Sequence, residues 1–169
     1  WFSEMLPLSF DLALEIGLFR KLMKEKLCVA VSKKEVIQFI HEYLYVDENA
    51  AHSIYEYFLE QFEYAKIPTI SRIIVEHHTT EKGAKYVIFH TLYGRRVNDC
   101  LSRALAYAIS KTQHRDVEIG INDNGFFITA QKNVNVMHAF SLIKVKEFRQ
   151  VLDSAIDKSE VFKRRFRHC

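Results

Sequence analysis

Two adjacent arginines at the expected start of a helix are the residues whose types and spacing best suit contact with a ligand. Arg95 and Arg96 follow Gly94, which permits a sharp turn into the helix. Cations are unfavourable at the positive N-terminal end of a helix dipole, but they become favourable there if they hold a phosphate or a carboxylate. The alternative is structural, because Asp99 lies four positions from both Arg95 and Arg103 and would pair with them on the helix surface. The residues alone leave both readings open.

A second basic cluster lies near the end of the chain. Phe162 and Phe166 lie four positions apart, so they would share one face of a final helix. We expect the two rings to pack inward and the basic face to remain available to a phosphate backbone, although exposed arginines without a ligand are the plainer alternative. The basic residues of this cluster are Lys163, Arg164, Arg165 and Arg167.

Three carboxylates lie near one expected hairpin, at Asp116, Glu118 and Asp123. Carboxylates two positions apart on a strand share a face, as a two-metal nuclease site would require. A further ligand and a lysine partner cannot be placed, so a solvated strand face is the better interpretation.

Histidines form another possible metal site, because His77 and His78 follow Glu76 on an expected strand and His90 lies on its partner. Successive side chains on a strand point to opposite faces, so His77 and His78 cannot both join one site. We therefore expect surface or half-buried histidines and no metal site.

Sequence motifs of several large enzyme classes are missing. There is no glycine-rich phosphate loop ending in Lys-Ser/Thr, no dinucleotide fingerprint, no HExxH zinc motif and no GxSxG nucleophile elbow. We therefore expect no catalytic residue and no cofactor within this chain.

Composition is that of a globular protein, with 49% hydrophobic and 27% charged residues in a chain of 169. Cys28, Cys100 and Cys169 are scattered and form no CxxC pair, which favours a reducing cytoplasm. No apolar run approaches the roughly 20 residues of a membrane-spanning helix. Residues 1–64 carry six Lys and Arg against eleven Asp and Glu, while residues 65–169 carry eighteen against ten. The basic part would attract phosphates.

Hydrophobic periodicity predicts an α+β fold, with a helical lobe at residues 1–65 and an α+β domain at residues 66–169. Two hairpins would form one antiparallel sheet packed with helices in two layers, and their turns are Glu81-Lys82-Gly83 and Asn122-Asp123-Asn124-Gly125. The expected strands are 72–78, 86–90, 117–121 and 126–130. The expected helices are 9–27, 32–43, 47–64, 94–111, one from about 134, 144–156 and one from 159. Because the chain lacks an initial Met and ends inside this last helix, we expect it to be a piece of a longer protein.

Several blocks of sequence, in order, resemble the large helicase-related (Lhr) family of superfamily 2 helicases, and its archaeal members most strongly. The resemblance is to the region after the helicase core, and it spans nearly the whole chain. The blocks are Leu6-Pro7-Leu8-Ser9-Phe10, residues 45–51, Leu92-Tyr93-Gly94-Arg95-Arg96-Val97-Asn98-Asp99, residues 101–106, Asn122-Asp123-Asn124-Gly125-Phe126 and residues 163–169.

This resemblance implies a parent protein with two RecA-like motor domains, a winged helix and a further domain, to which this chain corresponds. Such helicases use ATP and Mg in their motor, move 3′ to 5′ on single strands and unwind DNA or RNA:DNA duplexes. The resemblance then implies partners of two kinds: the nucleic acid, and the motor and winged-helix domains of the same protein. The basic blocks of the family map only onto Arg95, Arg96, Arg103, Arg164, Arg165 and Arg167.

Three hypotheses follow from these observations. The first is an accessory domain that helps to bind single-stranded nucleic acid, and it predicts salt-dependent binding. The second is a structural brace that docks on the motor and winged helix, and it predicts an exposed apolar patch. The third is an independent nuclease that uses Asp116 or Asp123.

Overall fold

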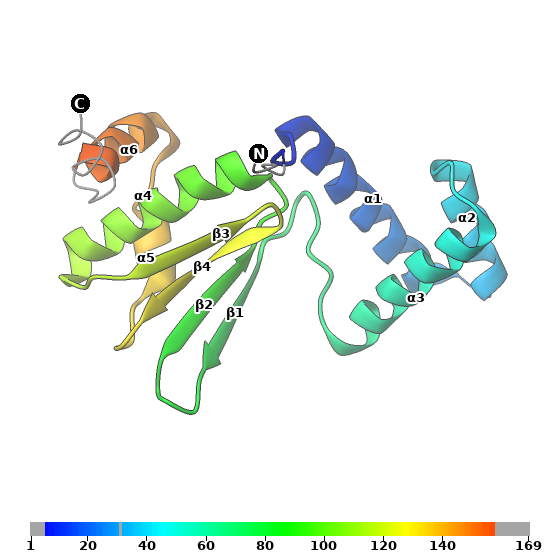
Figure 1. Ribbon diagram of the computed structural model, residues 1–169, viewed down its shortest axis with the longest axis horizontal. Helices are drawn as coiled ribbons and strands as arrows, with labels where there is room; N and C mark the ends of the chain where they lie inside the picture. The colour runs from blue at the N-terminus through cyan, green and yellow to red at the C-terminus, as the bar shows by residue number, and fades with distance from the viewer. Residues whose placement is uncertain (1–5, 31, 158–169) are drawn as a thin grey trace, which may run out of the picture. The chain divides into compact units, whose positions relative to one another are not determined.

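The computed structural model describes residues 6–30 and 32–157, which form six α-helices, a short 3-10 helix and a four-stranded antiparallel sheet (Figure 1). The α+β class is therefore confirmed. The described residues fold as two units: one is Asp11–Ile74, and the other combines the residues up to Phe10 with those from Val75 onward. The elements are α1 (Phe10–Val29), α2 (Lys33–Tyr43), α3 (Glu48–Tyr64), β1 (Ile74–Thr79), β2 (Lys85–His90), α4 (Arg95–Gln113), β3 (Glu118–Asn122), β4 (Gly125–Ala130), α5 (Val136–Ser141), η1 (Val145–Glu147) and α6 (Phe148–Asp157).

The helical unit begins its second and third helices at side-chain caps. Ser32 Oγ accepts a hydrogen bond from the Glu35 N–H at 3.4 Å, and Asp47 Oδ1 accepts one from the Ala50 N–H at 2.8 Å. Each cap satisfies a backbone donor that the first helical turn leaves unpaired.

The core of the helical unit is built around Phe19, whose ring meets the Phe58 ring edge-on with centroids 5.8 Å apart. Met23 and Ile40 are fully buried beside it. Leu12, by contrast, is 53% exposed. Smaller residues take the buried side instead: the chain at Ile70 lies only 3.5 Å from the position where a Cβ of Gly17 would be.

The sheet has the strand order β1-β2-β4-β3. Strand β4 lies antiparallel to β3 through the predicted hairpin and antiparallel to β2, with Val87 opposite Ile128. Chain order alone does not give the β2–β4 pair, because α4 and β3 separate these strands in the sequence. The turn at Gly83, with φ of 81°, joins β1 to β2.

One face of the sheet is buried under helices. Phe89 of β2 stacks on Phe126 of β4 with ring centroids 4.6 Å apart, and Phe140 of α5 lies 6.4 Å from Phe89. Helix α4 packs against β3, β4, α5 and α6, with Leu105 and Ile109 fully buried (Figure 1). This is the two-layer packing that the sequence predicted.

The opposite face of the sheet keeps a row of aromatic rings at the surface. His78 lies 6.4 Å from Tyr86, and Tyr86 lies 5.6 Å from Phe127, measured between ring centroids. Phe127 covers Gly120 of the edge strand and is 38% exposed. We call His78, Tyr86 and Phe127 the aromatic row.

Among the helices of the described ranges, none is long and apolar enough to cross a membrane.

Candidate nucleic-acid interface

Helix α4 begins at Gly94, where only glycine fits. Its φ of 79° is in the left-handed region, and a Cβ would lie 2.7 Å from the backbone oxygen of Leu8. Gly94 offers no side-chain cap, and the first turn of α4 contains no acidic residue. Neither a capping side chain nor an acidic residue of the first turn therefore neutralises the positive end of this helix.

Asn98 fixes the start of α4 to the β3–β4 hairpin. Its side chain is fully buried, and its amide donates to the backbone oxygens of Asn122 at 3.0 Å and Asp123 at 3.2 Å. Its Oδ1 accepts a hydrogen bond from the Thr91 hydroxyl at 2.8 Å. Asp123 also accepts a hydrogen bond from the Leu8 N–H at 3.2 Å. The backbone that carries the two arginines is thus held by buried hydrogen bonds, which are costly to break.

Arg95 and Arg96 are both exposed at this fixed helix start. The structural alternative predicted that Asp99 would pair with both Arg95 and Arg103, but only the pair with Arg103 is present. Asp99 Oδ1 lies 2.7 Å from Arg103 Nε, so its charge is used by Arg103. Toward the residues that the structure describes, neither Arg95 nor Arg96 makes a hydrogen bond or an ion pair.

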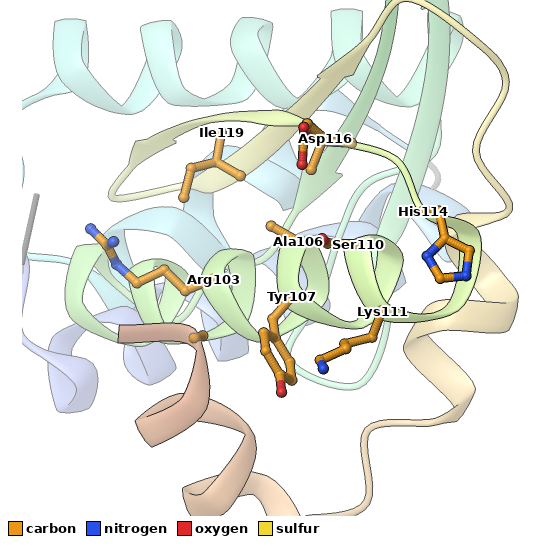
Figure 2. A pocket seen from close by; sticks show the side chains of 10 residues that line it. Arg103, Ala106, Tyr107, Ser110, Lys111, His114, Asp116 and Ile119 are labelled. Atoms are coloured by element: carbon orange, nitrogen blue, oxygen red, sulfur yellow. The ribbon is translucent and has the colours of Figure 1, made fainter. Parts of the chain in front are cut away.

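Beyond Arg103, the exposed side of α4 forms the floor of a groove of about 510 Å³, which we call the α4 groove (Figure 2). Ile119 of β3 and Ala155 of α6 lie at its sides. Its polar residues are Arg103, Tyr107, Ser110, Lys111, His114 and Asp116. Sequence reasoning missed Tyr107 and Lys111, although the spacing of four that joins them to Arg103 would have placed all three on one side of a helix.

The last helical turn of α4 places Lys111 at the groove. Lys111 Nζ lies 5.8 Å from the centroid of the Tyr107 ring, a distance at which a cation is attracted to the ring face. His114 ends the helix in the left-handed conformation, with φ of 50° and ψ of 46°. This αL ending turns the chain toward Asp116 and β3.

Cys100 lies on the same exposed side of α4, between Arg96 and Arg103. The pKa of its thiol is raised, first by burial of the sulfur among neighbouring atoms and then by the negative charge of Asp99, and Arg103 partly offsets this. Although part of the side chain is exposed, the thiol therefore stays protonated at neutral pH and is a poor nucleophile.

The other sequence candidates lie apart from this surface or outside the described residues. Lys163, Arg164, Arg165 and Arg167 fall outside the described ranges. His90 Nε2 lies 3.2 Å from Glu76 Oε2, which suits an ion pair when the histidine is protonated, although the angles do not form a hydrogen bond. In the part of the chain that the structure describes, no group of three or more His, Cys, Asp and Glu side chains is placed to hold a metal ion.

Comparison with known proteins gives a consistent result. The DEAD/H associated family matches residues 67–169. The ATP-dependent helicase Lhr-Core of Methanothermobacter thermautotrophicus is 50% identical over 169 residues, which cover 100% of this chain and 20% of that protein. Lhr-Core of Saccharolobus solfataricus is 40% identical over 175 residues, again covering 100% and 20%. Lhr-Core protein 2 of Thermococcus barophilus is 45% identical over 170 residues, covering 99% and 19%.

A solved structure shares the fold. The Mycobacterium smegmatis helicase Lhr, solved bound to ssDNA and AMP-PNP, matches with a TM-score of 0.78 at 20% sequence identity. The match covers 100% of this chain and 21% of that one. This chain spans about one fifth of the length of the curated relatives it matches. The resemblance to the Lhr family is thereby confirmed: the chain belongs to the DEAD/H associated family and corresponds to a segment of the Lhr helicases.

Proposed function

We propose that this chain is an accessory domain of an ATP-dependent 3′-to-5′ helicase of DNA or RNA:DNA duplexes, and that it helps to bind the single strand. The relatives that it matches over its whole length are named as ATP-dependent helicases. ATP and Mg would bind in the motor of the whole protein, since this sequence has no phosphate loop. A cytoplasmic location belongs to the same proposal, because scattered cysteines suit a reducing compartment.

The observation that carries this proposal is the pair Arg95 and Arg96 at the start of α4. Both are exposed, and the only nearby acid on the helix, Asp99, is paired with Arg103. The helix start has no side-chain cap and no acidic residue, so a bound phosphate would satisfy its backbone donors and both guanidinium groups. The buried bonds of Asn98 hold the site in place before ligand arrives, which lowers the entropy cost of binding.

A salt titration of single-strand binding tests this function. Binding of a labelled single-stranded oligonucleotide to the chain should weaken linearly in log affinity as log salt rises, with a slope of about −0.7 for each phosphate neutralised. Replacing both arginines, Arg95→Gln with Arg96→Gln, should weaken binding and reduce the slope by about 1.4.

The matched control makes the same charge change on the helical unit. Lys34 and Lys66 are exposed, so Lys34→Gln with Lys66→Gln removes two positive charges from the unit that does not contain α4. Equal losses of affinity in the arginine and the lysine double variants would mean that only the net charge of the chain matters. No binding by the unaltered chain at any salt concentration would refute the function itself.

The structural brace is the second candidate function, and the aromatic row favours it. Phe127 is 38% exposed beside Tyr86 and His78, and such contiguous surface often marks a contact with another domain. Phe127→Asp at the matching position of a whole Lhr helicase should then lower the thermal midpoint more than Phe127→Asp lowers it in this chain. Equal shifts would leave the brace without support.

A further inference from the structure

The face of the sheet opposite α4 and α5 carries aromatic rings on both central strands. Phe89 of β2 and Phe126 of β4 are buried on the face that α5 covers. Because side chains alternate along a strand, Tyr86 and Phe127 lie on the other face. The strand order β1-β2-β4-β3 makes β2 and β4 the central strands, so the two rings lie near the middle of the sheet (Figure 1).

The aromatic row crosses three adjacent strands and keeps its rings at the surface. His78 on β1 is exposed, Tyr86 on β2 is half-buried, and Phe127 on β4 is 38% exposed. The Phe127 ring lies over Gly120 of β3, where a Cβ would be 2.2 Å from the ring carbon Cζ. Only a residue without a side chain leaves room for the ring in this position. Four-stranded sheets with aromatic side chains on an open face are a known means of stacking the bases of a single strand.

Two cations lie at the edge of the row, beside Tyr86. Tyr86 and Lys132 both line a hollow of about 660 Å³ and a smaller one of about 140 Å³, and Arg115 lines the larger. Lys132 and Arg115 are exposed, and toward the residues that the structure describes neither makes a hydrogen bond or an ion pair. Lys85 Nζ donates a hydrogen bond to Asn133 Oδ1, which ties the segment that carries Lys132 to β2. Both cations are therefore available to phosphates of a strand that reaches Tyr86.

Two carboxylates in the larger hollow decide how such a strand would lie. Asp116 and Glu118 line it together with Lys132 and Arg115. Carboxylates accept hydrogen bonds only, so they repel phosphate but suit the amino groups of bases. A strand would therefore turn its bases toward the sheet and keep its phosphates at the two cations. A bare phosphate ion would gain little from the rings.

The surroundings of the row favour a nucleic acid over another protein domain. On the same face of the sheet, Glu76 lies 3.2 Å from His90, and Glu118 lies opposite Thr129. Ile88, between Tyr86 and His90 on β2, is half-buried. The centre of a protein–protein contact is depleted in charged residues, whereas bases stack on isolated rings within a polar surface.

We propose that the aromatic row is a stacking surface for bases of the bound single strand, with phosphates at Lys132 and Arg115. This rests on the proposed function, because the ligand is the same strand. It adds a contact through bases to the contact through phosphates at Arg95 and Arg96. The sequence preference should be weak, because every base has a π-face.

Two oligonucleotides of equal length, one of mixed sequence and one abasic throughout, test the stacking. Phe127→Ala should weaken binding of the mixed-sequence strand about tenfold and leave binding of the abasic strand unchanged, because the abasic strand has phosphates but no bases. Tyr86→Ala should behave in the same way, and Phe127→Tyr should keep most of the affinity. The control is Tyr64→Ala, since Tyr64 is 85% exposed on α3, and this variant should bind both strands like the unaltered chain.

A cation variant gives the complementary result. Lys132→Gln should weaken binding of both strands and reduce the magnitude of the salt slope by about 0.7, whereas Phe127→Ala should leave the slope unchanged, because stacking releases no ions. Lys34→Gln, on the other unit, should leave affinity and slope as they are.

The outcomes separate this proposal from the proposed function. If Phe127→Ala and Tyr86→Ala bind both strands like the unaltered chain while the Arg95 and Arg96 variants bind both more weakly, the stacking surface is wrong and the proposed function stands. Equal losses on the mixed-sequence and abasic strands would also overturn the stacking surface. If the unaltered chain binds neither strand, both proposals fail.

Two further measurements do not depend on the folding of the alanine variants. In the unaltered chain, the NMR signals of the Tyr86 and Phe127 rings should shift on adding the mixed-sequence strand and stay in place on adding the abasic strand. A cysteine at the position of Phe127 in a whole Lhr helicase, Phe127→Cys, should react with an alkylating reagent in the absence of nucleic acid and be protected by the mixed-sequence strand. Protection without nucleic acid would mean that another domain covers the row, and would overturn the proposal in favour of the brace.

Discussion

Cys100 reports on the electrostatics of the exposed side of α4. The pKa of its thiol is raised by burial and by Asp99, so little thiolate exists at neutral pH. In a chain with Cys28→Ser and Cys169→Ser, alkylation of Cys100 should be slow at neutral pH. Its rate should rise with pH around a midpoint above the ordinary thiol pKa. Alkylation of the same chain in denaturant measures that ordinary pKa. Mass spectrometry of the alkylated chain measures the rate at each pH.

Charge variants separate the two causes of this pKa shift. Asp99→Asn removes the negative charge, so it should lower the pKa of Cys100 and speed alkylation, whereas Arg103→Gln should raise the pKa and slow it. A midpoint that neither variant moves would leave burial as the only cause.

At single residues, sequence reasoning found the exposed arginines but not their surroundings. The spacing of four allowed Asp99 to pair with Arg95 or Arg103, and only the side-chain geometry of the folded helix selects Arg103. The burial of Asn98 could not be predicted from the residues, because an Asn in a helix is usually at the surface. Its burial depends on the hairpin backbone at Asn122, which lies 24 positions further along the chain.

Two glycines with the same backbone conformation test how α4 begins. Gly94 and Gly83 have φ of 79° and 81°, but a Cβ at Gly94 would lie 2.7 Å from the Leu8 backbone oxygen, while nothing lies within 4 Å at Gly83. Gly83→Ala should cost only left-handed strain, about 1–2 kcal/mol. Gly94→Ala should cost about 1–3 kcal/mol more, because a backbone oxygen must also move.

Urea unfolding followed by circular dichroism measures both glycine variants against the unaltered chain. The difference between the two losses isolates the contact with Leu8, since the strain common to both cancels. Equal losses would show that the segment at Leu8 yields freely and that it does not fix the start of α4.

At the scale of elements, the sequence predicted nearly every helix and strand of the described residues. Alternation and helical periodicity are local properties, so the strands at 86–90 and 126–130 emerged within a residue of β2 and β4. The strand order was beyond such reasoning, since β2 pairs with β4 across the whole of α4. The α4 groove was missed for the same reason, because its walls come from β3 and α6.

Charge is distributed unevenly over the whole molecule. Residues 1–64 have five more acidic than basic residues, and residues 65–169 have eight more basic than acidic ones. Counted by unit, Asp11–Ile74 has ten Asp and Glu against eight Lys and Arg, whereas the remainder of the sequence, which includes α4 and most of the sheet, has eleven against sixteen. A polyanion should therefore be attracted to one unit and repelled by the other.

Hydrogen exchange of the complete chain tests this division. At low salt, a saturating single-stranded oligonucleotide should slow amide exchange in peptides from α4 and its flanking loops. Peptides from α1, α2 and α3 should exchange as in the free chain. High salt should remove the protection, because screening shortens the range of these charges to a few ångströms. Protection centred on α3 instead would place the strand on the acidic unit, and would show that aromatic contacts at residues such as Tyr57 or Tyr64 outweigh the charge of the molecule.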